Sequence, residues 1–359
     1  MRMVKPVLVG LVFAALTAPA LAQVPKASDG KPDLSGFWTH ASLTPLIRAP
    51  SNKTLVVSEE EAKRIAAAVP MAGVTEEGFK GATYSDPNKG PPPKGAKDFG
   101  VQGYDSFWMD PGARLAKVKG EWRTSYVVEP ASGQLPYVDP AGQAKKRALR
   151  SERYETGNAA YEGPEATNIA ERCLIGFANA AGPGMLSGLY NSNYQMVQTK
   201  DHMMILAEMA HDARVIPIFA DAATARANHK PSAIQPWFGD TVGWWEGDTF
   251  VMESVNINPV QVEAQSSFPI SENAVVTERF TRTGEQDILY EFSVSDPETY
   301  TQPWKAELSF YPSPGWYEYA CHEGNYGMHG ILAGAREKER QAEQAAKAKS
   351  RSKTVKGGQ

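Results

Sequence analysis

Two short clusters of ionisable side chains could move protons. The first is Glu208-Met-Ala-His-Asp-Ala-Arg214, between two apolar runs that we interpret as strands. An unperturbed imidazole titrates near neutral pH, and a guanidinium stays charged at physiological pH. His211 could therefore act as general base or acid, oriented by Asp212 or Glu208, while Arg214 stabilises an anion. The alternative is a turn with ordinary salt links.

The second cluster is His322-Glu-Gly-Asn325, directly after Cys321. Residues 316–321 predict a strand, and loops at the ends of rigid elements often carry function. We expect His322 and Glu323 to supply a second proton transfer and Asn325 to contact the substrate. The alternative is a strand end held by local hydrogen bonds.

A metal site is a further possibility that the spacing does not demand. His322 and Glu323 are followed by His329 seven residues after the first histidine, whereas a zincin helix needs a spacing of four. A metal would have to combine His211, His322 and His329 with a distant carboxylate, which would suit a metal-dependent hydrolase. The sequence shows no nucleophile elbow, P-loop or dinucleotide fingerprint, so we expect no cofactor.

Aromatic residues gather near the predicted hairpins, notably in Trp244-Trp-Glu-Gly-Asp248. Large aromatic side chains either fill a core or contact an aromatic or sugar ring. As substrate-binding residues we expect, besides Asn325, four side chains: Tyr194, Asp212, Trp244 and Tyr290. The alternative for the aromatic members is that they only pack the core.

The first 22 residues predict a cleaved secretory signal. Arg2 and Lys5 precede an apolar run at 7–16, and Ala20-Leu-Ala22 matches a cleavage site. The run is too short to cross a bilayer, and no later segment is long and apolar enough. We therefore predict a periplasmic or extracellular protein that starts at Gln23 and has no membrane span.

Two cysteines, Cys173 and Cys321, form an even pair. In an oxidising compartment such a pair favours a disulfide. The alternative is a catalytic thiol, because His322 adjoins Cys321 and could lower its pKa.

The charge pattern opposes a nucleic-acid partner. The chain has 37 Lys and Arg against 41 Asp and Glu, and its basic residues are enriched after Arg336. The rest of the chain is therefore acidic, whereas nucleic-acid binding needs a basic face. We expect a small-molecule partner; the oligomeric state cannot be predicted.

The fold prediction is mainly β: an antiparallel up-and-down barrel with an irregular N-terminal collar and a C-terminal helix. From Tyr190 onward about nine short strands alternate with turn signals. Period-two patterns place Ile288, Tyr290, Phe292 and Val294 on one face. The predicted division is a signal at 1–22, one barrel domain at 23–335 and a basic helical or disordered tail at 336–359. Within the domain, 23–185 form the collar and insertions and 186–330 the main hairpins.

Two resemblances add to this prediction. Gly36-Phe-Trp38 resembles the Gly-x-Trp opening of lipocalins and other calycins, in which the Trp closes the barrel floor. The chain also resembles a widespread family of secreted bacterial proteins of mostly unassigned function. The matching segments include Glu171-Arg-Cys-Leu174, His211-Asp-Ala-Arg214 and Tyr319-Ala-Cys-His-Glu-Gly-Asn325. That resemblance implies an aromatic substrate and no specific catalytic residue.

These observations favour a cofactor-independent lyase or isomerase acting on a small aromatic compound. One concrete version removes formaldehyde or water from a lignin-derived aromatic dimer. General acid–base catalysis contributes about 10²–10⁴ in rate, so the substitution His211→Ala should cost at least that much. The alternatives are a periplasmic binding protein for an apolar or aromatic ligand and the metal-dependent hydrolase.

Overall fold

The computed structural model describes residues 24–69, 111–146, 148, 163–188, 190–264, 267–313, 315–321 and 326–356. The predicted signal and three of the expected site residues, His322, Glu323 and Asn325, lie outside these ranges.

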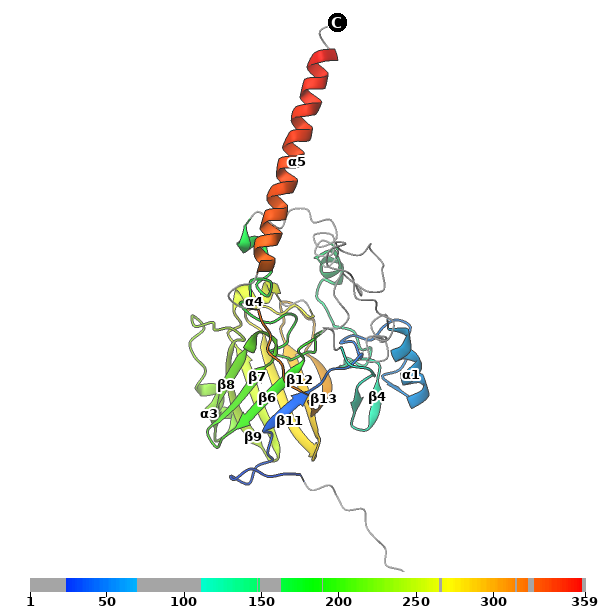
Figure 1. Ribbon diagram of the computed structural model, residues 1–359. Helices are drawn as coiled ribbons and strands as arrows, with labels where there is room; N and C mark the ends of the chain where they lie inside the picture. Colours follow the sequence, from blue (N-terminus) through cyan, green and yellow to red (C-terminus); the bar gives the residue numbers. More distant parts are fainter. Residues whose placement is uncertain are drawn as a thin grey trace, which may run out of the picture.

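The described residues form a closed nine-strand barrel, so the predicted fold class is confirmed (Figure 1). The sheet order is β1-β6-β7-β8-β9-β10-β11-β12-β13, and β13 pairs back onto β1. The strands are β1 (Gly36–Thr39), β6 (Asn193–Gln198), β7 (His202–Ala207), β8 (Ala213–Phe219), β9 (Asp240–Glu246), β10 (Thr249–Val255), β11 (Val275–Gly284), β12 (Asp287–Ser295) and β13 (Trp304–Pro312).

Alternation along the strands decides which side chains fill the barrel. The predicted face of β12 is fully buried, with Ile288, Tyr290, Phe292 and Val294 all at 0% exposure. In β13 the residues from Trp304 to Phe310 with even numbers also join the core. Because successive side chains in a strand point to opposite faces, the odd-numbered residues of β13 lie on the outer wall.

One strand pair departs from the predicted antiparallel order. β8 and β9 are parallel, with Ile218 opposite Gly243. Between them the chain forms α3 (Ala222–Ala227), and residues 228–239 then lead to the start of β9. Parallel neighbours need such a crossover, because a tight hairpin reverses the chain direction.

The prediction of a strand at 316–321 is wrong. Residues 315–321 contain no strand, and β1 completes the barrel instead. Pro312 ends β13, and the Tyr317 amide then donates to the Glu208 side chain. A strand needs its amides for a neighbouring strand, which this contact prevents at that position.

The N-terminal segment 24–35 lies at one end of the barrel (Figure 1). Trp38 is buried, and its indole nitrogen donates to the Leu34 carbonyl over 3.0 Å. The Arg282 guanidinium lies 5.1 Å from the Trp38 ring centroid and also donates to the Asp33 carbonyl. This arrangement is consistent with the calycin-like closure that Gly36-Phe-Trp38 suggested.

The collar packs beside the barrel. It contains α1 (Glu59–Ala68) and a small sheet of β2 (Val56–Val57), β4 (Glu121–Arg123) and β3 (Lys117–Val118), while β5 (Val127–Glu129) pairs with β13. Ser58 caps α1, because its side chain accepts a hydrogen bond from the Glu61 amide.

The remaining elements lie mainly around the other end of the barrel. They are η5 (Pro164–Ala166), η6 (Met209–His211), α4 (Pro259–Ala264) and α5 (Tyr326–Lys356), which projects away from the barrel (Figure 1). None of the helices in the described ranges has the length and apolar character needed to cross a bilayer.

Candidate functional site

We call the end of the barrel opposite segment 24–35 its mouth, and residues 163–188, here called the plug loop, pack against it. Apolar side chains of this loop, including Ile175 and Met185, belong to the main core. Its backbone also meets the barrel interior, because the Met185 amide donates to the Tyr290 hydroxyl over 2.7 Å. The plug loop therefore brings chain from outside the hairpins against the predicted site.

A disulfide between Cys173 and Cys321 confirms the predicted pairing. It joins the plug loop to segment 315–321 across 148 residues of sequence. A disulfide is compatible with a location outside the cytoplasm. Because Cys321 is oxidised, it is not the catalytic thiol considered as an alternative.

Glu208 ties the same segment to the barrel. It is only 1% exposed, and its carboxylate accepts from the Asn193 side-chain amide and the Tyr317 backbone amide, each over 2.5 Å. These bonds hold the start of segment 315–321 at the mouth. The Glu208 carboxylate is therefore engaged with the Asn193 and Tyr317 amides rather than with the His211 imidazole.

Asp212 is a buried carboxyl group at the mouth, and its pKa is raised. It directly precedes β8, is 9% exposed, and accepts the Gly176 amide of the plug loop over 2.6 Å. Burial raises the pKa of Asp212 to about 7, although the bond from Gly176 opposes the shift. This carboxyl can therefore gain or lose a proton near neutral pH.

His211 lies next to Asp212 and is exposed. Its backbone has a positive φ of 57°, as does Ala210 before it at 60°, so the chain turns sharply here. Its imidazole forms no hydrogen bond with any described residue. The structure thus leaves the His211 ring facing solvent at the mouth and not fixed by either predicted carboxylate.

Arg214 lies deeper, inside the barrel. It is 4% exposed, and its Nη2 atom lies 2.6 Å from Oε2 of Glu278, which is fully buried. Nη2 also donates to the Ser254 hydroxyl over 3.0 Å, and Nη1 donates to Glu278 Oε1 over 3.2 Å. The guanidinium is therefore already bound to protein acceptors.

The two predicted tyrosines also lie in the interior. The Tyr290 hydroxyl donates to Glu278 over 2.6 Å, and the Tyr194 hydroxyl donates to the Ala180 carbonyl over 2.7 Å. Burial raises the pKa of both phenols. Their rings pack against Phe310 at centroid distances of 5.4 and 5.3 Å. Both therefore hold the core around the Arg214–Glu278 pair.

Trp244 lies outside the barrel interior, on the outer face of β9. It packs in a small cluster with Ala225 of α3, and the Arg226 guanidinium lies 5.2 Å from the centroid of its ring. The structure thus separates Trp244 from Tyr194, Asp212 and Tyr290.

Sequence reasoning missed Glu278 and His40. Glu278 occupies an inward position between Val276 and Phe280, and an acidic residue in an apolar alternation is a sign of a buried partner. His40 is 2% exposed, and its Nε2 atom lies 3.1 Å from the Tyr194 hydroxyl. No local pattern marked it, because its ring packs against Tyr194 of β6 and Phe310 of β13, which are distant in sequence.

Within the described ranges, no three or more His, Cys, Asp or Glu side chains are grouped so that they could hold a metal ion. Comparison with known proteins adds no assignment, because neither a protein-family model nor a curated protein matches the chain. The site has to be interpreted from its own geometry.

Proposed function

We propose that the protein is an extracytoplasmic acid–base enzyme, a lyase or isomerase, which acts on a small aromatic compound at the barrel mouth. The observation that carries this proposal is the buried Asp212 carboxyl, whose pKa of about 7 suits proton transfer at neutral pH. The exposed His211 beside it supplies a second group able to exchange protons.

The chemistry is proton abstraction followed by elimination. In the dehydration version, Asp212 removes a proton from carbon, the electron pair forms a double bond, and His211 protonates the departing hydroxyl. In the formaldehyde version, the base takes the proton of a primary alcohol, the C–C bond breaks, and the released carbon is protonated. His322 and Glu323, which follow Cys321 in sequence, remain part of the proposal as the second proton-transfer pair.

Arg214 receives a supporting role in this scheme. Its guanidinium is held by Glu278 and Ser254, so it fixes the start of β8, from which Asp212 extends. It is a positioning residue and does not contact the substrate.

The test is turnover of lignin-type aromatic dimers, with products identified by mass spectrometry. The wild type should show kcat/KM rising through about pH 7, because the base acts when deprotonated. Asp212→Asn should lower kcat/KM by roughly 10²–10⁴ and abolish its rise through about pH 7. His211→Ala should lower kcat/KM by at least about 10².

Matched controls are Asp201 in the β6–β7 turn and His202, the first residue of β7. Asp201→Asn and His202→Ala change the same residue types at exposed positions outside the mouth and should leave the rate unchanged. Wild-type rates in both Asp212→Asn and His211→Ala would remove the assignment.

A protein that only holds an aromatic ligand is the second candidate. It is favoured by the His211 imidazole, which no described side chain orients as a general base requires. Recovery of the dimer unaltered after incubation, with His211 and Asp212 variants changing affinity alone, would support this candidate.

A further inference from the structure

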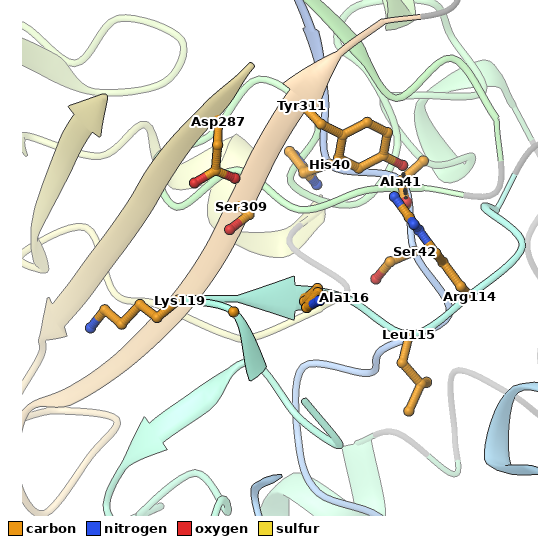
Figure 2. Close-up of a pocket in the computed structure, with 12 residues that line it drawn as sticks. His40, Ala41, Ser42, Arg114, Leu115, Ala116, Lys119, Asp287, Ser309 and Tyr311 are labelled. Atoms are coloured by element: carbon orange, nitrogen blue, oxygen red, sulfur yellow. Dashed lines mark hydrogen bonds between the residues drawn. The ribbon is translucent and has the colours of Figure 1, made fainter. Parts of the chain in front are cut away.

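A cavity of about 310 Å³ lies between the outer wall of the barrel and the collar (Figure 2), and its lining includes none of His211, Asp212 and Arg214. β13 supplies Ser309 and Tyr311, and the collar supplies the segment from Arg114 to Gly120. The chain directly after β1, His40 to Ser42, completes one side. The volume lies at the lower end of those found for small-molecule sites.

A polar side chain in this cavity has no partner. Alternation in β13 turns Ser309 outward, toward the collar, because Leu308 and Phe310 point into the core. Ser309 is 9% exposed, and its buried hydroxyl makes no hydrogen bond with a described residue. A buried polar group without a partner costs free energy, so such a group is typical of a site that a ligand completes.

His40 provides a second group of this kind. The Tyr194 hydroxyl donates to the Ala180 carbonyl, so His40 Nε2 must donate to the Tyr194 oxygen. The Nδ1 atom of His40 is buried and has no hydrogen-bond partner among the described residues. Burial lowers the pKa of His40 to about 3, so the ring that lines the cavity is neutral.

Positive charge collects at one side of the cavity. The Arg114 guanidinium lies 5.8 Å from the Tyr311 ring and 6.0 Å from the Trp122 ring, and no carboxylate in the described ranges pairs with it. Lys117 lies 5.5 Å from the same Trp122 ring.

The other charges of the lining are balanced or distant. Lys119 is paired with Glu307 at 2.8 Å, and Asp287 accepts the Thr283 hydroxyl. Figure 2 shows Asp287 and Arg114 on opposite sides of the labelled group. An arginine free of carboxylates is thus available at the aromatic side.

We infer that this cavity is a second binding site, which takes a small aromatic carboxylate. The Arg114 guanidinium fits a carboxylate with two parallel hydrogen bonds, and the Tyr311 ring offers a face for an aromatic ring. The Ser309 hydroxyl satisfies a polar substituent such as a phenolic hydroxyl. The site is separate from the mouth, so it stands or falls independently of the proposed catalysis.

The probes are benzoate, 4-hydroxybenzoate and the neutral benzyl alcohol, titrated into the full chain by calorimetry. Both acids should bind, and benzyl alcohol should bind at least about tenfold more weakly, because charge-assisted hydrogen bonds dominate. Arg114→Gln should weaken the binding of benzoate by about tenfold. Ser309→Ala should weaken 4-hydroxybenzoate more than benzoate.

Arg279→Gln is the matched control, because Arg279 lies on the outer wall at β11 and pairs with Glu246. It should bind both acids as the wild type does. Absence of binding of either acid to the wild type, or benzyl alcohol binding as tightly as benzoate, would overturn the inference.

A labelling experiment on the wild type keeps the test independent of variant folding. 4-Azidobenzoate is irradiated with the protein, and the modified peptides are identified by mass spectrometry. Labels on residues 40–42, 114–120 or 309–311, suppressed by excess benzoate, support the site. Labels confined to other segments reject it.

Discussion

Arg214 and Glu278 form an ion pair in the interior of the barrel, with Arg214 Nη2 and Glu278 Oε2 2.6 Å apart. β8 and β11 carry the two residues, 64 positions apart in sequence. The Tyr290 hydroxyl and the Ser254 hydroxyl complete the shell of hydrogen bonds around them. The pair therefore links β8 and β11, which β9 and β10 separate in the sheet.

Removing one member of this pair should cost more than removing both. Glu278→Leu or Arg214→Met leaves an uncompensated buried charge, with an expected loss of about 3–5 kcal/mol in the free energy of unfolding. The double substitution should lose less free energy of unfolding than either single substitution, because it leaves no uncompensated charge. Urea unfolding monitored by circular dichroism measures all three variants. Additive losses would show that the two side chains do not act as a pair.

The stability of the protein should depend on Asp212 between about pH 4 and pH 7. Its folded-state pKa of about 7 lies above the ordinary value of 3.8, so the folded state keeps a proton that the unfolded state releases. Stability should therefore fall as pH rises through this window, by at most about 1.4 kcal/mol per pH unit.

Asp212→Asn should remove this decline, because the amide can still accept the Gly176 amide but does not ionise. The free energy of unfolding of the variant, relative to that of the wild type, should increase between pH 4.5 and pH 8. Urea unfolding at each pH measures it. Asp201→Asn serves as the exposed control. A parallel pH dependence in wild type and Asp212→Asn would contradict the buried-carboxyl assignment.

Breaking the disulfide should loosen the mouth. Replacing Cys173 and Cys321 together by serine should lower the free energy of unfolding by about 2–4 kcal/mol, because the bond closes a long loop. Limited proteolysis should then cut the plug loop before the barrel strands. Wild-type resistance of residues 163–188 in the double variant would show that core packing alone holds the loop.

A second titrating contact lies on the outer wall. His229 Nδ1 lies 2.8 Å from Asp240, and its other nitrogen lies 3.7 Å from Glu253. Burial by itself would lower the pKa of His229, but hydrogen bonds and charge from Glu253 and Asp240 outweigh it and raise the pKa.

The stabilisation from His229 should be present below about pH 6.5 and disappear as pH rises through the raised value. His229→Gln should therefore lower the free energy of unfolding by on the order of 1 kcal/mol or less at pH 5.5 and leave it unchanged at pH 9. Thermal unfolding at the two pH values measures this, with His202→Ala as the control. An equal loss at both pH values would point to lost packing.

The period-two patterns were sufficient to predict the barrel. The inward rows of β12 and β13 follow directly from alternation, because a strand sends successive side chains to opposite faces. Alternation did not predict that β8 and β9 are parallel. It also did not predict that β1, rather than residues 316–321, completes the barrel. Both depend on which strand edges meet in space, and local sequence does not carry that information.

Residue types and their spacing predicted the alternating barrel strands, the pairing of two cysteines and the neighbourhood of His211, Asp212 and Arg214. Contacts between distant segments set the roles of these residues. The tertiary structure turned Arg214 inward to Glu278, left His211 in solvent, and covered Asp212 with the plug loop so that burial shifts its pKa. Burial and pairing arise from segments distant in the chain, so residue type and spacing fix the candidates but not their protonation states.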